Sequence, residues 1–284
     1  MLQSGAALGF CAALSWGLVD TLVAVLTRRA DPLTVTLAVH ATGVVALCAL
    51  ALALDDTPAM SAGHWALALG LSPIAGLAYL TFYKSLRLGP IAIVSPIASA
   101  NGVLVVALAV LVLGSTLRPL QVAGAGIVLV CAVLVAIELG EGSRGATGPG
   151  GPRLAAIASV AFGGYLFGLV VLVEDLGWLM PILLTRTGGV AVLVLVAARS
   201  GRDHRLARRL LPAAAAAGLL EVAGYLVFNR GADIGEAAST AAAAAAYPLV
   251  PTLYGLLALH ERLAPHQIVG VAGILAGMVL LSIG

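Results

Sequence analysis

Charged residues and cysteines are both scarce in this sequence. Charged residues occupy 10% of the 284 positions, whereas hydrophobic residues occupy 61%. Soluble domains carry roughly 25% charged and 45–50% apolar residues, so the composition argues against a water-soluble fold. The net charge of +2 is too small to indicate a nucleic-acid partner. The three cysteines lie inside apolar runs without metal-site or disulfide spacing, and we expect neither a metal site nor a cofactor.

Ten apolar segments are long enough to cross a bilayer, for which roughly 20 residues are needed. They cover residues 4–27, 33–54, 64–83, 90–113, 119–139, 154–173, 178–198, 212–229, 234–259 and 265–283. We therefore predict an all-α polytopic membrane protein with ten transmembrane helices.

The connections between these segments divide the chain and orient it. Only "GEGSRGATGPGGPR" is rich in both glycine and proline, so we predict repeats at 1–140 and 154–284 with a linker at 141–153. Of the fourteen lysines and arginines between spans, twelve lie in every second connection, beginning with the first. Cytoplasmic loops carry such an excess, which places both chain ends outside. We expect a multi-pass protein of the cell membrane, namely a bacterial inner membrane.

The two halves of the chain resemble each other at an offset of 146 residues. The offset aligns "AYLTFYKSLRLGP" with "GYLVFNRGADIGE", and it pairs Trp16 with Phe162 and His40 with Arg186. Each half holds five spans, and an odd number implies that the second half crosses the membrane upside down. Inverted repeats are typical of transporters that bind their ligand near the midplane.

The ends of the two halves carry a recognisable motif. "LGSTLRPLQVAG" and "LHERLAPHQIVG" resemble the leucine-glycine-glutamate pattern of the drug/metabolite transporter superfamily, specifically its ten-helix EamA type. The second half keeps Glu261 but has His260 for the glycine, whereas Ser115 replaces the acid in the first half. That departure leaves open a lost structural bond or an altered gate. The resemblance implies secondary transport without enzymatic activity, more often export, of substrates such as amino acids, drugs or quaternary amines.

Arg186 and His40 lie in the middle of predicted spans. A buried charge in a membrane is expensive, so such residues face a cavity or a partner. The resemblance places an arginine at this point of the second and seventh helices, and here His40 holds the first of these places. Two alternatives stay open: Arg186 anchors a carboxylate of the substrate, or it pairs with an internal acid and stabilises the bundle.

Two acids are candidates for coupling or ion binding. Asp20 follows Trp16 by one helical turn, and its depth resembles that of the first-helix glutamate in small multidrug-resistance proteins. We expect it to exchange protons or cations, or else to pair with Arg186 or His40. Glu221 begins a polar stripe on the eighth span and is the second candidate acid.

Aromatic and amide side chains complete the predicted site. Rings with polar groups suit aromatic, cationic or zwitterionic ligands, although hydrogen bonding between helices also explains them. The expected substrate-binding residues are Trp16, His40, Tyr79, Asn101, Arg186, Tyr225 and Tyr247.

These features predict a secondary transporter that works by alternating access, more often for export. Its expected substrate is a small polar or zwitterionic, amino-acid-like metabolite. The alternative is a proton-coupled transporter of organic cations or quaternary amines, either a multidrug exporter or a choline-like importer. A membrane enzyme or sensor fits less well, because no catalytic set and no sizeable soluble domain is evident. The expected partners are the lipid bilayer, a small-molecule substrate and protons, with the protein a monomer or homodimer.

Overall fold

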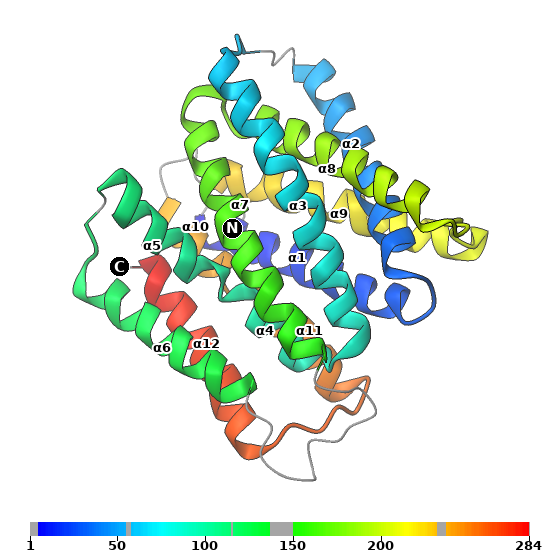
Figure 1. The fold of residues 1–284 in the computed structure, drawn as a ribbon. Helices are drawn as coiled ribbons and strands as arrows, with labels where there is room; N and C mark the ends of the chain where they lie inside the picture. The colour runs from blue at the N-terminus through cyan, green and yellow to red at the C-terminus, as the bar shows by residue number, and fades with distance from the viewer. Residues whose placement is uncertain (1–4, 55–57, 115, 137–149, 232–236, 284) are drawn as a thin grey trace.

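A computed structural model describes residues 5–54, 58–114, 116–136, 150–231 and 237–283. These residues form helices joined by short connections and contain no strand, which confirms the all-α prediction (Figure 1). The elements are α1 (Gly5–Thr27), α2 (Pro32–Leu54), α3 (Ala62–Leu88), α4 (Ile91–Ser99), α5 (Asn101–Leu113), α6 (Pro119–Ala136), α7 (Gly150–Leu176), α8 (Leu179–Ser200), η2 (Arg208–Leu210), α9 (Leu211–Gly231), α10 (Ala237–Ala244), α11 (Leu249–Leu257) and α12 (Pro265–Ile283).

Most of the predicted spans appear as single long helices. Within the described residues, eight helical segments are long and apolar enough to cross a membrane, and the shorter apolar helix Pro119–Val135 accompanies them. Large apolar side chains are exposed on the outside of the bundle, among them Leu52 at 85%, Leu111 at 81% and Leu257 at 72%. An apolar exterior is what a bilayer requires of a spanning protein.

The two predicted spans that carry several prolines, 90–113 and 234–259, are interrupted. The segment 90–113 changes direction at Ala100, which separates α4 from α5. The segment 234–259 is divided into α10 and α11 by turns at residues 245–248. Pro248 explains the second interruption, because it lacks the N–H that a continuous helix would need there. Pro96 lies inside α4, one turn before the first interruption.

Helix α7 begins within the range predicted as the linker. Helix α7 begins at Gly150, so residues 150–153 belong to the helix, whereas 141–149 lie outside the described residues. Pro152 falls in the first turn of α7, where a helix does not need its missing N–H. A proline that argued for a linker in the sequence is therefore compatible with a helix start.

The halves pack as if related by a two-fold axis. Helix α1 packs along α9 while the equivalent α7 packs along α3, and α6 lies beside α12 (Figure 1). Close approaches are reciprocal in the same way: a Cβ built on Gly124 would lie 2.8 Å from the Gly277 carbonyl oxygen. One built on Gly270 would lie 3.0 Å from the carbonyl oxygen of Cys131. Each pair is the other displaced by 146 residues, so the repeat in the sequence is a repeat in the packing.

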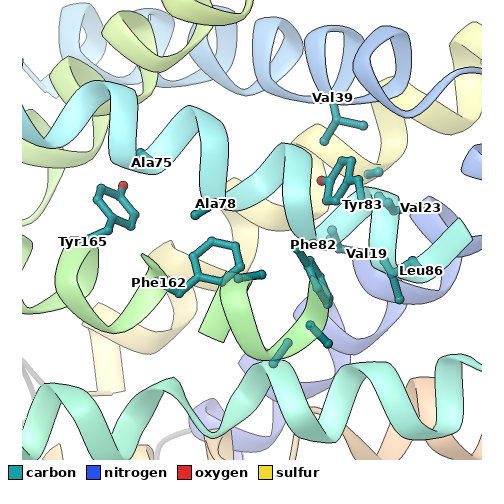
Figure 2. Packing of buried hydrophobic residues seen from close by; sticks show 14 of the residues in the cluster. Val19, Val23, Val39, Ala75, Ala78, Phe82, Tyr83, Leu86, Phe162 and Tyr165 are labelled. Atoms are coloured by element: carbon teal, nitrogen blue, oxygen red, sulfur yellow. The ribbon is translucent and has the colours of Figure 1, made fainter. Parts of the chain in front are cut away.

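The buried core runs between the two halves. Figure 2 shows Phe82 and Tyr83 of α3 among side chains of α1, α2 and α7, with Phe162 approaching from α7. Tyr83 is 1% exposed and Phe82 is 6% exposed. This packing holds α3 against α7 and fixes the walls of the cavity described next.

Candidate functional site

A cavity of about 210 Å³ lies between the two halves. Helices α1, α3, α5, α7, α9 and α12 contribute to its wall, together with the end of α4 and the turn before α11. Its lining residues are Trp16, Val19, Asp20, Tyr79, Phe82, Tyr83, Ala98, Ser99, Asn101, Phe162, Leu166, Glu221, Tyr225, Tyr247 and Met278. Seven of the nine predicted site residues therefore face one space, and His40 and Arg186 are the two that do not line it.

Two aromatic clusters contribute to this wall. In one cluster, the Trp16 ring centroid lies 5.5 Å from that of Tyr225 and 6.4 Å from that of Tyr247. In the other, the Phe162 centroid lies 4.8 Å from that of Tyr79. Trp16 and Phe162 are equivalent positions of the repeat, as are Tyr225 and Tyr79. Each half thus supplies the same aromatic surface to the cavity.

Eight lining residues were not among the predicted ones, and two aromatic ones had a signal in the sequence. Phe162 is the repeat equivalent of the predicted Trp16, and Tyr83 belongs to the first-half copy of the polar stripe. Ser99 and Met278 gave no comparable signal, because their orientation depends on the break at Ala100 and on the rotation of α12.

Asp20 faces the cavity, and in the described part of the chain a single hydroxyl is its hydrogen-bond partner. Its side chain is 8% exposed, and the Ser95 hydroxyl of α4 donates to Asp20 Oδ2 over 2.7 Å. Among the described residues, neither Arg186 nor His40 pairs with it. Within the described residues, a carboxylate there has one hydrogen bond and no cation to balance it, an arrangement that attracts a proton or a cation.

Arg186 is held by its neighbours on the other side of Tyr79. Its Nε donates to His40 Nδ1 over 2.9 Å, and its Nη2 donates to Glu221 Oε2. The Tyr79 hydroxyl donates to the second oxygen of Glu221, Oε1, over 2.8 Å. Arg186 is 5% exposed and Glu221 is 4% exposed. The guanidinium and the carboxylate therefore neutralise each other within the bundle.

His40 and Arg186 line a much smaller cavity of about 10 Å³. Tyr79 and Tyr225 face both spaces, so they form the partition between the small cavity and the large one. Of the two roles considered for Arg186, this geometry favours internal pairing. Its contact with a substrate stays a prediction, as does that of His40.

The interrupted helices place polar groups at the cavity wall. Asn101 begins α5, and its Nδ2 donates to the Ala98 carbonyl oxygen over 2.9 Å. Tyr247 occupies the equivalent position in the second half, within the turn that precedes α11. The breaks at Ala100 and at residues 245–248 thus orient one amide and one phenol toward the same space.

The charge pattern of the site is unequal between the halves. Asp20 has Leu166 as its repeat equivalent, and Glu221 has Ala75. Because Glu221 is balanced by Arg186, Asp20 is the lining group whose charge lacks an ion-pair partner in the described part of the chain. An aromatic wall around one such acid suits a ligand that is both flat and positively charged.

Comparison with known proteins gives a consistent result. No curated protein matches the chain. A solved structure described only as "Crystal structure of protein" is 20% identical and superposes with a TM-score of 0.64, over 97% of this chain and 95% of that one. At that identity the likeness shows the fold alone.

The family comparison covers both halves. The pattern of the EamA-like transporter family matches residues 3–137 and again residues 151–283. These two matches confirm the resemblance that the end motifs suggested, and they coincide with the two five-span repeats. The chain belongs to the EamA-like transporter family and is a multi-pass membrane transporter.

Proposed function

We propose that the protein is an alternating-access exporter of small organic cations, exchanged for protons at Asp20. The observation that carries this proposal is the uncompensated Asp20 carboxylate in an aromatic cavity between the halves. An ammonium group beside that carboxylate, with apolar parts against Trp16 and Phe162, meets both chemical features of the wall. A site of about 210 Å³ is smaller than the roughly 300–1,000 Å³ typical of drug-sized ligands, so the substrate is small.

The transport cycle follows from the two-fold arrangement. Two repeats of opposite orientation around a central site are able to exchange conformations, which opens the site first to one side and then to the other. The reciprocal packing of the halves and the odd number of spans in each repeat support the inverted orientation. Rocking of the two repeats, with α4/α5 and α10/α11 bending at their breaks, is the proposed motion.

Exchange requires that proton and substrate exclude each other. A protonated Asp20 no longer attracts an ammonium group, and a bound ammonium group disfavours protonation of the same carboxylate. If the site changes the side to which it opens only when it holds either a proton or a cation, each proton that enters is exchanged for a cation that leaves. Ser95 is able to donate to the carboxylate, and its hydroxyl oxygen is able to accept once Asp20 is protonated.

The zwitterionic metabolite expected from the sequence is the second candidate. The observation in its favour is that the side chains of Tyr79 and Tyr225, which line both cavities, lie between Arg186 and the large cavity. A substrate carboxylate would have to replace Glu221 as the partner of the guanidinium. Because that exchange breaks an existing buried ion pair, the geometry favours the cation.

Proteoliposomes loaded with a radiolabelled aromatic amine test the proposal. An inward-directed proton gradient should accelerate amine efflux from wild-type vesicles, and Asp20→Asn should abolish this acceleration. Asp203→Asn makes the same acid-to-amide change in an exposed loop and should behave like wild type. Efflux that ignores the gradient in wild-type vesicles, or proton-driven efflux of a zwitterion but not of an amine, would overturn the cation assignment.

A further inference from the structure

Glu261, outside the central site, joins the two halves at one end of the bundle. It lies in the connection between α11 and α12, and its oxygens accept from the first N–H groups of α4. The Ile91 N–H donates to Oε1 over 3.1 Å, and the Ala92 N–H donates to Oε2 over 3.0 Å. The Nη2 of Arg28, which follows α1, donates to Oε1 over 3.0 Å. One side chain of the second half thus holds two elements of the first.

The backbone around Glu261 is shaped for this contact. His260 has φ of 52°, in the left-handed region, and the Glu261 N–H donates to the Gly255 carbonyl oxygen over 2.9 Å. A Cβ built on Gly255 would lie 2.5 Å from Glu261 Oε2 and 2.8 Å from Ile91 Cγ2. Only a glycine at position 255 lets α11, the carboxylate and the start of α4 come this close.

The opposite end of the bundle lacks these groups. At the offset of 146 residues, Glu261 corresponds to Ser115 and Arg28 corresponds to Glu174. Gly255 corresponds to Ala109, whose Cβ occupies the space that the glycine leaves open. At the equivalent positions, the acid, the arginine that pairs with it and the glycine that leaves room for it are therefore all replaced by other residues. The sequence supplies the connection at one end and not at its equivalent.

The packing is unequal in the same sense. Helix α4 packs against both α11 and α12 at the Glu261 end. By the repeat, α10 is the equivalent of α4, yet in the described residues α10 does not form packed pairs with α5 and α6. The contacts of α4 with α11 and α12 thus close the bundle beside Glu261, whereas α10 packs mainly against α1 and α12. Because the connection that carries Arg28 belongs to the arginine-rich set, the closed end is expected to be cytoplasmic.

We infer that Glu261 is a gate residue that holds the cytoplasmic side closed, so that the unliganded carrier rests open to the outside. This inference rests on the proposed alternating access. It adds a reason why the outward-open conformation is more populated than the inward-open one when no ligand is bound. Opening the cytoplasmic side requires α4 to separate from α11. This separation breaks the hydrogen bonds that two N–H groups of α4 donate to the Glu261 carboxylate. At the other end, the described residues link the halves through the solvent-exposed pair of His64 Nε2 and Asp175 Oδ2 at 3.1 Å, which is a weaker restraint.

Spin-label distances measured without any substrate test this gate. In a chain whose three cysteines are replaced, labels at Arg87→Cys and Leu257→Cys report the separation of α3 and α11 at the closed end. Wild type should give mainly the shorter distance. Glu261→Gln keeps the size but weakens the bonds to α4, and it should raise the longer-distance population roughly fivefold. Arg28→Ala should act in the same direction to a smaller extent.

Arg29→Ala is the matched control, because this exposed neighbour of Arg28 makes no contact with Glu261. It should leave the distances unchanged. Unchanged distances in both Glu261→Gln and Arg28→Ala, or an equal effect of Arg29→Ala, would overturn the inference. The measurement involves neither a cation nor Asp20, so a failure of the proposed substrate class leaves its result standing. Should Glu261→Gln not fold, Arg28→Ala against Arg29→Ala decides the question.

Discussion

Arg186 donates from Nε to Nδ1 of His40 over 2.9 Å, although the two residues hold the same position in the two halves of the chain. Equivalent positions meet each other only where a two-fold axis passes between them. This hydrogen bond supports the inverted arrangement that we propose, with the axis of the repeat beside the large cavity. The ion pair with Glu221 and the partition formed by Tyr79 and Tyr225 are built around the same point.

Removing the arginine should unfold the bundle before it affects the ligand. Arg186→Ala leaves Glu221 as an uncompensated buried charge, for which the loss of stability is about 3–5 kcal/mol. Combining it with Glu221→Gln removes that charge and should restore part of the stability. Thermal unfolding in detergent measures both variants. An Arg186→Ala variant as stable as wild type would contradict the role of Arg186 as the ion-pair partner of Glu221.

Two glycines of α6 should respond oppositely to the same substitution. A Cβ on Gly124 meets the Gly277 carbonyl oxygen, so Gly124→Ala should destabilise the α6–α12 contact by about 1–3 kcal/mol. A Cβ on Gly126 meets no atom within 4 Å, so Gly126→Ala should be neutral or stabilising by up to about 1 kcal/mol. Unfolding midpoints of the two variants, compared under one condition, check the difference. Equal effects would mean that α6 and α12 do not approach as described.

Trp16 should report substrate binding directly. With Trp65→Phe and Trp178→Phe, it becomes the remaining tryptophan, and an aromatic amine should quench its fluorescence. Trp16→Ala should then weaken amine affinity by about three- to thirtyfold, the range of roughly 0.5–2 kcal/mol expected for a cation on an aromatic face. Trp65→Ala, at an exposed position, should leave the affinity unchanged. Quenching that does not saturate would remove Trp16 from the binding wall.

Position 260, in the turn before Glu261, should accept glycine, the residue found at the equivalent position of the first half. His260 has φ of 52°, whereas Gly114 occupies the same position in the first half with φ of 68°. A left-handed conformation costs a residue with a side chain about 1–2 kcal/mol, so His260→Gly should stabilise the protein by up to about that amount. Chemical or thermal unfolding measures the change. A clear loss of stability would show that the histidine side chain has a role of its own there.

The apolar spans and the internal repeat were enough to predict most of the fold, because both are visible in the order of residues along the chain. They also placed Trp16, Asp20 and Tyr225 on helix faces that turned out to line one cavity. The partner of Arg186 was not predictable, since Asp20 and Glu221 are both acids at plausible depths and helix rotation decides between them. The exact places of the interruptions, at Ala100 and at residues 245–248, were not predictable for a related reason. Proline indicates a bend, but the neighbouring helices determine whether the bend becomes a break.

Proton release on substrate binding distinguishes cation–proton exchange at Asp20 from simple cation binding. Purified protein in weakly buffered detergent solution, at a pH where Asp20 carries its proton, is mixed with a saturating aromatic amine, and a pH indicator records the protons set free. One proton per bound cation is predicted for wild type, with none from Asp20→Asn. Saturable binding of the amine without proton release in wild type, or the same release from Asp20→Asn, would contradict the account.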